Sequence, residues 1–262
     1  NDVCRLIRIP SDRKEPYGEF PFGEGPGKCL EEALEIATSM GFKTRNYENY
    51  VGAIDFNDYE KKLDILAHLD VVPVGDDWTV TKPFEPKIVN GRLYGRGAAD
   101  DKGPAIAALY AMLAVKKLNI PLKKNVRLIL GTDEECGGED IDYYYNLEQE
   151  APMTFSPDAD YPVINIEKGG LRGSFRAEFK EDEHLPRIRF MKGGFKTNVV
   201  ADTAVAQIEG FTEDDVVEIL RFVEVKTQVK FKTSMQDNVM TIEAKGFAAH
   251  ASTPEKGKNA NP

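Results

Sequence analysis

Four short polar motifs carry the residues of this chain that could do chemistry. They are HLD at 68–70, GRGAADDKGP at 95–104, DEE at 133–135 and SPDADYP at 156–162. Ligands of open α/β sheets bind outside the carboxyl ends of the strands, and the first and third motifs directly follow apolar runs of strand length. We therefore expect the four motifs to meet on one rim of a sheet.

Each motif also has a purely structural interpretation. In an acidic chain, a histidine two residues before an aspartate, or a doublet such as Glu134-Glu135, is common on a solvated surface. Asp100-Asp101 could favour the N-terminus of the helix that follows, a contribution of at most about 1 kcal/mol. These interpretations leave unexplained why several carboxylates and one imidazole gather on one rim, where the acids would repel one another unless a cation neutralised them.

The types of these side chains indicate which cation would bind. Imidazole and carboxylates without a thiolate cluster favour zinc or a similar divalent ion. An acid next to the ligands could serve as the base that activates a water molecule. The pattern therefore predicts metal-assisted hydrolysis.

The elements that must position these motifs follow from hydrophobic periodicity. Residues 61–70 and 125–132 are apolar runs typical of central strands. Residues 28–41 carry an apolar stripe with a period of 3.6 that stops at a glycine, and residues 103–118 begin with a proline and end in lysines, so both segments are predicted helices. This order of strands and helices predicts an α/β fold, a mixed sheet with helices on both faces.

The pattern of predicted strands and helices changes after about residue 167. Strand-like runs flank Gly169-Gly170, and the later segments are predicted as strand 199–209, helix 212–223, strand 228–232 and strand 238–245. The sequence therefore predicts two domains, residues 1–167 and a smaller α+β domain over residues 168–262.

Composition excludes several classes of function. The chain has 262 residues and a net charge of −10, which disfavours nucleic acid as a partner, and its apolar stretches fall far short of the roughly 20 residues of a membrane span. Its three cysteines show no CxxC spacing and predict free thiols, and hence a cytoplasmic location. The chain starts at Asn1 without an apolar region behind it, so no secretory signal is expected.

The order of the four motifs resembles the aminoacylase and carnosinase type of co-catalytic zinc metallopeptidases, and within them the dipeptidase V branch. The resemblance runs from LIRIPS at 6–11 to HASTP at 250–254. It implies that residues 1–167 are the N-terminal part of a catalytic domain, that 168–262 are part of a lid domain, and that the substrate is a dipeptide or short peptide.

The resemblance also implies a role for each site residue. His68, Asp100 and Asp158 would bind one zinc ion, and Asp100 and Glu135 the other, with Asp100 bridging the two. Asp70 would orient His68 through the ring nitrogen that does not bind metal, and Glu134 would be the general base. The peptide bond between Asp100 and Asp101 would be cis. In the lid, His250 and Asn198 would contact the substrate.

The chain departs from the family pattern at the second zinc ion. The family completes that site with a further histidine late in the catalytic domain, and His184, which stands in no matching motif, cannot replace it. We therefore expect this chain to be a fragment or a protein completed by another piece, with the C-terminal part of the catalytic domain absent, and to be nearly inactive alone.

Three alternatives stay open from the sequence. A deacylase or desuccinylase of N-acylated amino acids would use the same metals. A metal-binding fragment without catalysis is the non-enzyme alternative. The branch resemblance favours a monomer, whereas related enzymes with dimerising lids form homodimers.

Overall fold

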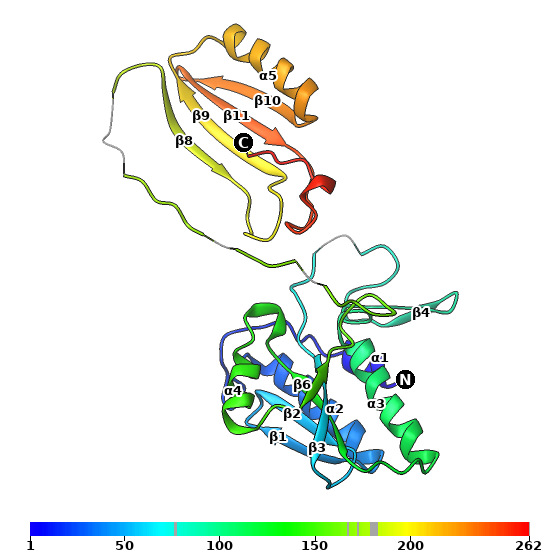
Figure 1. The fold of residues 1–262 in the computed structure, drawn as a ribbon. Coiled ribbons are helices and arrows are strands. Elements are labelled where there is room, and N and C mark those ends of the chain that lie inside the picture. The colour runs from blue at the N-terminus through cyan, green and yellow to red at the C-terminus, as the bar shows by residue number, and fades with distance from the viewer. Residues whose placement is uncertain (76–77, 167, 172, 179–182, 262) are drawn as a thin grey trace. The chain divides into compact units, whose positions relative to one another are not determined.

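The computed structural model describes residues 1–75, 78–166, 168–171, 173–178 and 183–261. The chain forms two compact units, Asn1–Ile164 and Asn165–Pro262 (Figure 1).

The first unit is built on a five-stranded sheet. Its strand order is β1 (Lys43–Tyr47), β2 (Val51–Asp55), β6 (Asn125–Gly131), β3 (Lys61–His68) and β7 (Met153–Phe155). β6, β3 and β7 run parallel to one another, whereas β2 is antiparallel to both β1 and β6. The sheet is therefore mixed, as predicted.

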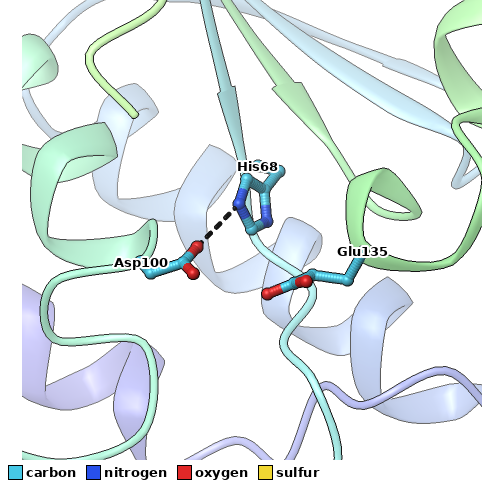
Figure 2. Close-up of side chains that lie close together, drawn as sticks. All are labelled: His68, Asp100 and Glu135. Atoms are coloured by element: carbon cyan, nitrogen blue, oxygen red, sulfur yellow. Dashed lines mark hydrogen bonds and ion pairs between the residues drawn. The ribbon is translucent and has the colours of Figure 1, made fainter. Parts of the chain in front are cut away.

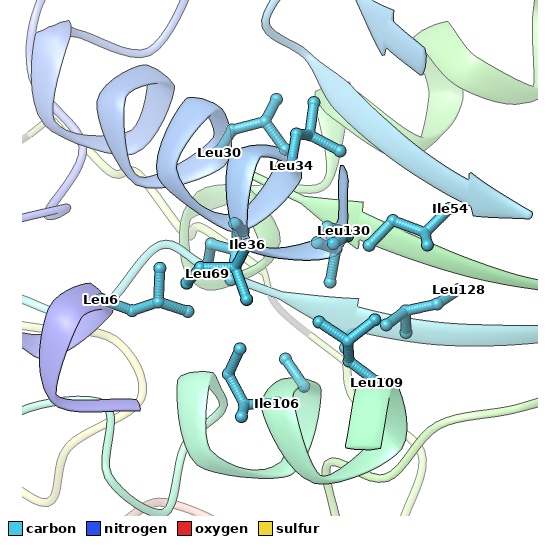
Figure 3. Packing of buried hydrophobic residues seen from close by; sticks show 14 of the residues in the cluster. Leu6, Leu30, Leu34, Ile36, Ile54, Leu69, Ile106, Leu109, Leu128 and Leu130 are labelled. Carbon is cyan, nitrogen blue, oxygen red and sulfur yellow. The ribbon is translucent and has the colours of Figure 1, made fainter. Parts of the chain in front are cut away.

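Helices cover both faces of this sheet, which confirms the predicted fold class. One face packs against α1 (Asp2–Ile7), α2 (Glu24–Ser39) and α3 (Lys102–Lys117). Figure 3 shows leucines and isoleucines of these helices and of the strands meeting in this core. The other face packs against α4 (Glu139–Leu147), whose fully buried Tyr144 contacts the sheet around Ile129.

The predicted elements of the first unit agree with the structure to within a few residues. The two predicted central strands are β3 and β6, and the predicted helix 103–118 is α3. α2 begins four residues before the predicted start, with Pro26 in its first turn, and Gly41 at φ +78° stands just beyond its C-cap, Met40. A short hairpin, β4 (Lys87–Val89) and β5 (Arg92–Tyr94), precedes the GRGAADDKGP motif.

The second unit is a four-stranded antiparallel sheet with one helix. Its strand order is β10 (Lys230–Gln236), β11 (Val239–Lys245), β9 (Thr203–Glu209) and β8 (Arg187–Gly193), and its helix is α5 (Glu213–Thr227). The side chain of Thr212 caps α5 by accepting a hydrogen bond from the Asp215 N–H.

The predicted strand 199–209 is β9, which begins only at Thr203, because Val200 donates its N–H to the Ala249 carbonyl rather than to a neighbouring strand. One prediction for this unit was wrong. The runs flanking Gly169-Gly170 form no strand in the described residues of 163–178, where Leu171 and Phe175 are fully exposed and so gain no burial from pairing. No helix among the described residues is long and apolar enough to cross a membrane.

Candidate active site

Three of the four polar motifs follow the carboxyl ends of the parallel strands. His68 is the last residue of β3 and lies beside Gly131, the last residue of β6, so the DEE motif continues next to the imidazole. The SPDADYP motif follows β7, which pairs with β3 on its other side. The fourth motif precedes α3. The strand order therefore brings the motifs together on one rim of the sheet, as expected.

The carboxylates of these motifs surround the imidazole of His68. Its Nε2 lies 3.0 Å from Oδ1 of Asp100, 3.4 Å from Oδ2 of Asp158 and 3.9 Å from Oε2 of Glu134. Figure 2 shows Asp100 on one side of the ring and Glu135 on the other. The ring is almost fully buried, whereas the side chains of Asp100 and Glu134 are 61% and 58% exposed. The site is therefore buried at its histidine and open at its acids.

Asp70 connects this histidine to the DEE motif. The Nδ1 of His68 lies 3.0 Å from the backbone oxygen and 3.3 Å from Oδ1 of Asp70. The carboxylate of Asp70 is fully buried and accepts the backbone N–H groups of Glu134 at 3.1 Å and Glu135 at 3.0 Å. These two acids open the short helix η1 (Glu134–Cys136), so one carboxylate fixes both the ring and the acids beside it.

Asp101 holds the backbone of His68. Its Oδ2 accepts the His68 N–H at 3.1 Å, and its side chain makes no cap bond to α3 although Asp101 is the N-cap residue. The hydrogen bond of this aspartate therefore goes to the backbone of His68 and not to the N-terminus of α3. The peptide bond between Asp100 and Asp101 is cis, as the resemblance implied.

A second buried aspartate shapes the turn that carries Glu134 and Glu135. Asp140, at the start of α4, accepts the N–H groups of Thr132 at 2.6 Å and Asp133 at 3.0 Å. Asp133 in turn receives Arg13 Nη1 at 2.6 Å. The acidic turn is thus fixed by α4 and by the N-terminal segment, and its two glutamates point to the rim.

The pKa shifts show how strongly the acids act on the histidine. Burial opposes the charged form of His68, but hydrogen bonding to Asp100 and Asp70 outweighs it and raises the pKa to about 11. Burial raises the pKa of Glu135 to about 7, and repulsion from Asp100 acts in the same direction. Burial and neighbouring acids also raise the pKa of Glu134 and Asp158. The raised pKa of His68 and the repulsion among the acids indicate that positive charge is favoured at the centre of the cluster.

The side chains fit a divalent cation. Two groups offer ligand atoms that all lie within 4.8 Å of one another, His68 with Asp100 and Glu135, and His68 with Glu134 and Asp158. One imidazole with several carboxylates suits zinc and similar ions. In addition, Oδ1 of Asp101 is buried beside this cluster and has no hydrogen-bond partner among the described residues.

The two predicted substrate-binding residues lie in the second unit and are neighbours there. Val199, next to Asn198, forms a β-bridge with His250, and the Asn198 carbonyl accepts the Ala251 N–H at 2.8 Å. The Nδ1 of His250 accepts the Ser252 N–H at 3.2 Å. The neutral ring therefore carries its proton on Nε2. The contacts of these two residues with a substrate stay predictions.

Sequence reasoning missed the residues that hold the site in place. Asp101 was considered only as an acid near a helix end, and Asp140, Arg13 and Lys102 were not singled out at all. Asp101 and Lys102 bond backbone groups that lie 33 to 96 residues away, and Arg13 contacts carboxylates more than 100 residues away, which no local spacing indicates. Asp140 bonds nearer backbone groups, but only because the turn before α4 brings them to it. The only signal was the position of Asp101 directly after the candidate ligand Asp100.

The chain is similar to proteins of one peptidase family. Residues 65–255 match the sequence profile of Peptidase family M20/M25/M40. A relative from Bacillus subtilis (strain 168), "Putative dipeptidase YtjP", is 38% identical over 99% of this chain and 57% of its own length. "Beta-Ala-Xaa dipeptidase" from Lactobacillus delbrueckii subsp. lactis is 37% identical over 98% of this chain and 55% of its own length. The chain thus spans a little more than half the length of these relatives.

A solved structure, human carnosine dipeptidase 1, shares the fold. It aligns with a TM-score of 0.50 and 23% identity over 59% of this chain and 37% of its own. The profile match covers most of the chain and includes all four polar motifs around His68. The chain therefore belongs to peptidase family M20/M25/M40.

Proposed function

We propose that this chain is part of a zinc-dependent dipeptidase that hydrolyses dipeptides or short peptides. The observation that carries the proposal is the cluster of one buried imidazole and four carboxylates, which come from the carboxyl ends of β3, β6 and β7 and from the loop before α3. Peptidases of this family are metal-dependent, and the curated relatives named above are dipeptidases by name. These names favour a dipeptidase over a deacylase.

We assign the metal ligands as the resemblance implies. His68, Asp100 and Asp158 would hold one zinc ion, and Asp100 and Glu135 the other, with Asp100 shared. Bound zinc would polarise the substrate carbonyl and lower the pKa of water. The buried carboxylate of Asp70 would keep the imidazole in the orientation that ligation needs.

Glu134 is the proposed general base. It lies within 3.9 Å of the His68 ring and is half exposed, so its carboxylate can reach both the cluster and a substrate. It would take the proton of the attacking water and return it to the leaving amine. Burial raises its pKa, which favours the first step, because a carboxylate with a higher pKa takes up a proton more readily.

A cavity of about 890 Å³ beside the cluster offers room for a substrate side chain. Its lining is mostly apolar and also includes Asp100, Asp158 and Asp160, of which the first two belong to the cluster. We propose that a residue of the dipeptide enters this cavity while its peptide carbonyl meets the cluster.

The two units would have different roles in catalysis. We propose residues 1–167 as the N-terminal part of the catalytic domain and 168–262 as part of a lid, with His250 donating from Nε2 to the substrate carbonyl oxygen and Asn198 beside it. The described cysteines are free thiols, which supports the proposed cytoplasmic location.

Two substitutions test the proposal. His68→Ala should abolish stoichiometric zinc binding, measured by metal analysis after dialysis, and an unchanged zinc content would contradict the ligand assignment. Glu134→Gln, measured in the natural full-length protein, should keep its zinc and lower kcat for dipeptides by at least about 10². Near-normal turnover would assign the base to another carboxylate.

The second zinc ion would be weakly held by the 262 residues alone. Asp100 and Glu135 give it two protein ligands, fewer than the three that catalytic zinc usually has. We therefore propose that these residues alone are nearly inactive. Dipeptide hydrolysis by this chain and by the full-length protein at equal zinc tests this, and equal rates would show that one ion suffices.

A further inference from the structure

Lys102 is a buried cation that the proposed chemistry does not use. It is the first residue of α3, directly after the Asp100-Asp101 pair, and it is fully buried. Its Nζ donates to the carbonyl oxygens of Leu6 at 3.0 Å and Ile9 at 2.9 Å, at the end of α1. Burying an ammonium group is costly, so an apolar residue would be the cheaper choice for packing alone.

The backbone that Lys102 binds also holds the other side of the site. Ser11, two residues after Ile9, is fully buried; its hydroxyl donates to the Leu69 carbonyl at 2.7 Å, and its own carbonyl accepts the Val71 N–H at 3.2 Å. Residues 6–11 therefore contact the loop after His68 and the start of α3 at once. This is the LIRIPS segment, which has no role in the proposed catalytic mechanism.

We propose that Lys102 and residues 6–11 form a brace that positions the loop of Asp100 and Asp101 against His68. The Lys102 ammonium fixes the start of α3 to the end of α1, and Ser11 fixes the segment 69–71 to the same stretch of backbone. The His68 N–H then meets the carboxylate of Asp101 at 3.1 Å, and the His68 ring meets Asp100.

The packing around Lys102 leaves little freedom for this brace. A Cβ at Gly97 would lie 2.8 Å from Cδ of Lys102, so the loop before Asp100 passes directly over the lysine side chain. Gly97 also adopts φ +85°, which favours glycine, and its carbonyl accepts the Gly103 N–H. The loop is thus folded around the lysine, and Lys102 acts as a positioning residue.

Amide exchange tests the brace without metal and without substrate. Lys102→Met keeps the length of the side chain and removes the ammonium group; Lys117→Met is the matched control, because Lys117 is an exposed lysine on the same helix. In Lys102→Met, the His68 amide should exchange at least about tenfold faster while the amides of β1 and β2 keep their protection. Unchanged exchange at His68, or an equal loss over the whole sheet, would overturn the proposal.

Zinc affinity provides the second measurement, and this part rests on the proposed function. Lys102→Met should raise the zinc dissociation constant by about 10- to 100-fold, as loss of groups that orient ligands does, and Lys117→Met should not change it. If Lys102→Met does not fold, Ser11→Ala decides: faster exchange at His68 and Val71 supports the brace, and unchanged exchange overturns it. If the wild-type protein does not bind zinc, the proposed function is refuted. The exchange rate of the His68 amide would still decide whether the brace exists.

Discussion

Replacing Asp70 with asparagine should weaken the site and the fold together. The Asp70 carboxylate is fully buried and accepts two backbone N–H groups, from Glu134 and Glu135, while it faces Nδ1 of His68. Asparagine has nearly the same shape, but only one of its two terminal atoms accepts hydrogen bonds. At least one of the two N–H groups therefore loses its partner, and the other loses a charged one.

The size of the effect follows from these bonds. A hydrogen bond to a charged group contributes about 1.5–3 kcal/mol, and a buried donor left unpaired costs about 1–3 kcal/mol. We expect Asp70→Asn to lower the free energy of unfolding by about 3 kcal/mol, measured by urea denaturation. Because η1 and the His68 ring both lose their anchor, zinc affinity should fall by about 10- to 100-fold.

Asp64→Asn, on the strand that precedes Asp70, is the matched control. Asp64 is also fully buried, but it accepts the Ala151 N–H at 2.9 Å and pairs with Lys61, at the other end of β3 from His68. Its replacement should cost stability and leave zinc affinity unchanged. If Asp70→Asn keeps wild-type zinc affinity, or if Asp64→Asn loses as much, the role assigned to Asp70 is wrong.

A double substitution separates the two tasks of Asp70. If Asp70 supports catalysis by holding Glu134, then Asp70→Asn should lower kcat strongly in the wild type and only weakly in a Glu134→Gln background. Equal factors in both backgrounds would show that Asp70 acts on turnover independently of Glu134, for example through His68 alone.

Three further predictions concern stability. Arg127→Met should lower the free energy of unfolding by about 3 kcal/mol, because the mostly buried carboxylate of Asp55 loses the guanidinium that contacts it at 2.8 and 2.9 Å and keeps only the Asn125 amide. Wild-type stability in urea would refute this. Leu109→Ala should lower the free energy of unfolding by about 2–5 kcal/mol, because it opens a cavity in the core of Figure 3, and should keep the zinc stoichiometry. A smaller loss of Tm than that of Leu118→Ala, at an exposed leucine, would contradict this prediction. Burial raises the pKa of Glu148, but the Tyr47 hydrogen bond and Arg127 outweigh burial and lower it. The resulting stabilisation is present at neutral pH and is lost as the pH falls through the lowered folded-state pKa. Glu148→Gln should therefore make the free energy of unfolding fall less steeply as the pH is lowered into the acid range.

Hydrophobic periodicity predicted the long or strongly patterned elements. β3, β6, α3 and α5 each appear within a few residues of their predicted positions, apart from the C-terminal extension of α5 to Thr227. β2 was not predicted, although four of its five residues are buried, because it is short. β1 and β7 were not predicted. β1 is KTRNY with one buried residue and β7 has three exposed residues, so both are strands because of the neighbours they pair with rather than because of their own pattern.

The same distinction separates the two kinds of residue at the site. His68, Asp100, Glu134 and Glu135 could be found from the sequence, because strand ends and helix starts are local features and reactive side chain types are rare enough there to be noticed. Lys102, Asp101 and Asp140 could not, since what they do depends on carbonyl and N–H groups that the fold brings to them.

The positioning groups explain why an acidic rim can persist at all. Carboxylates that repel one another would move apart on flexible loops, yet here buried bonds hold the backbone beneath them: Asp70 the N–H groups of η1, Asp101 that of His68, and Lys102 the end of α1. These bonds span 33 to 96 residues of sequence, so the repulsion is set against the packing of the whole first unit. A cation that binds here meets carboxylates already held near His68. It therefore gains affinity from organisation that folding has already supplied. This is why we expect substitutions of Asp70 and Lys102, which hold this backbone, to lower zinc affinity, whereas Asp64→Asn, at the other end of β3, should not.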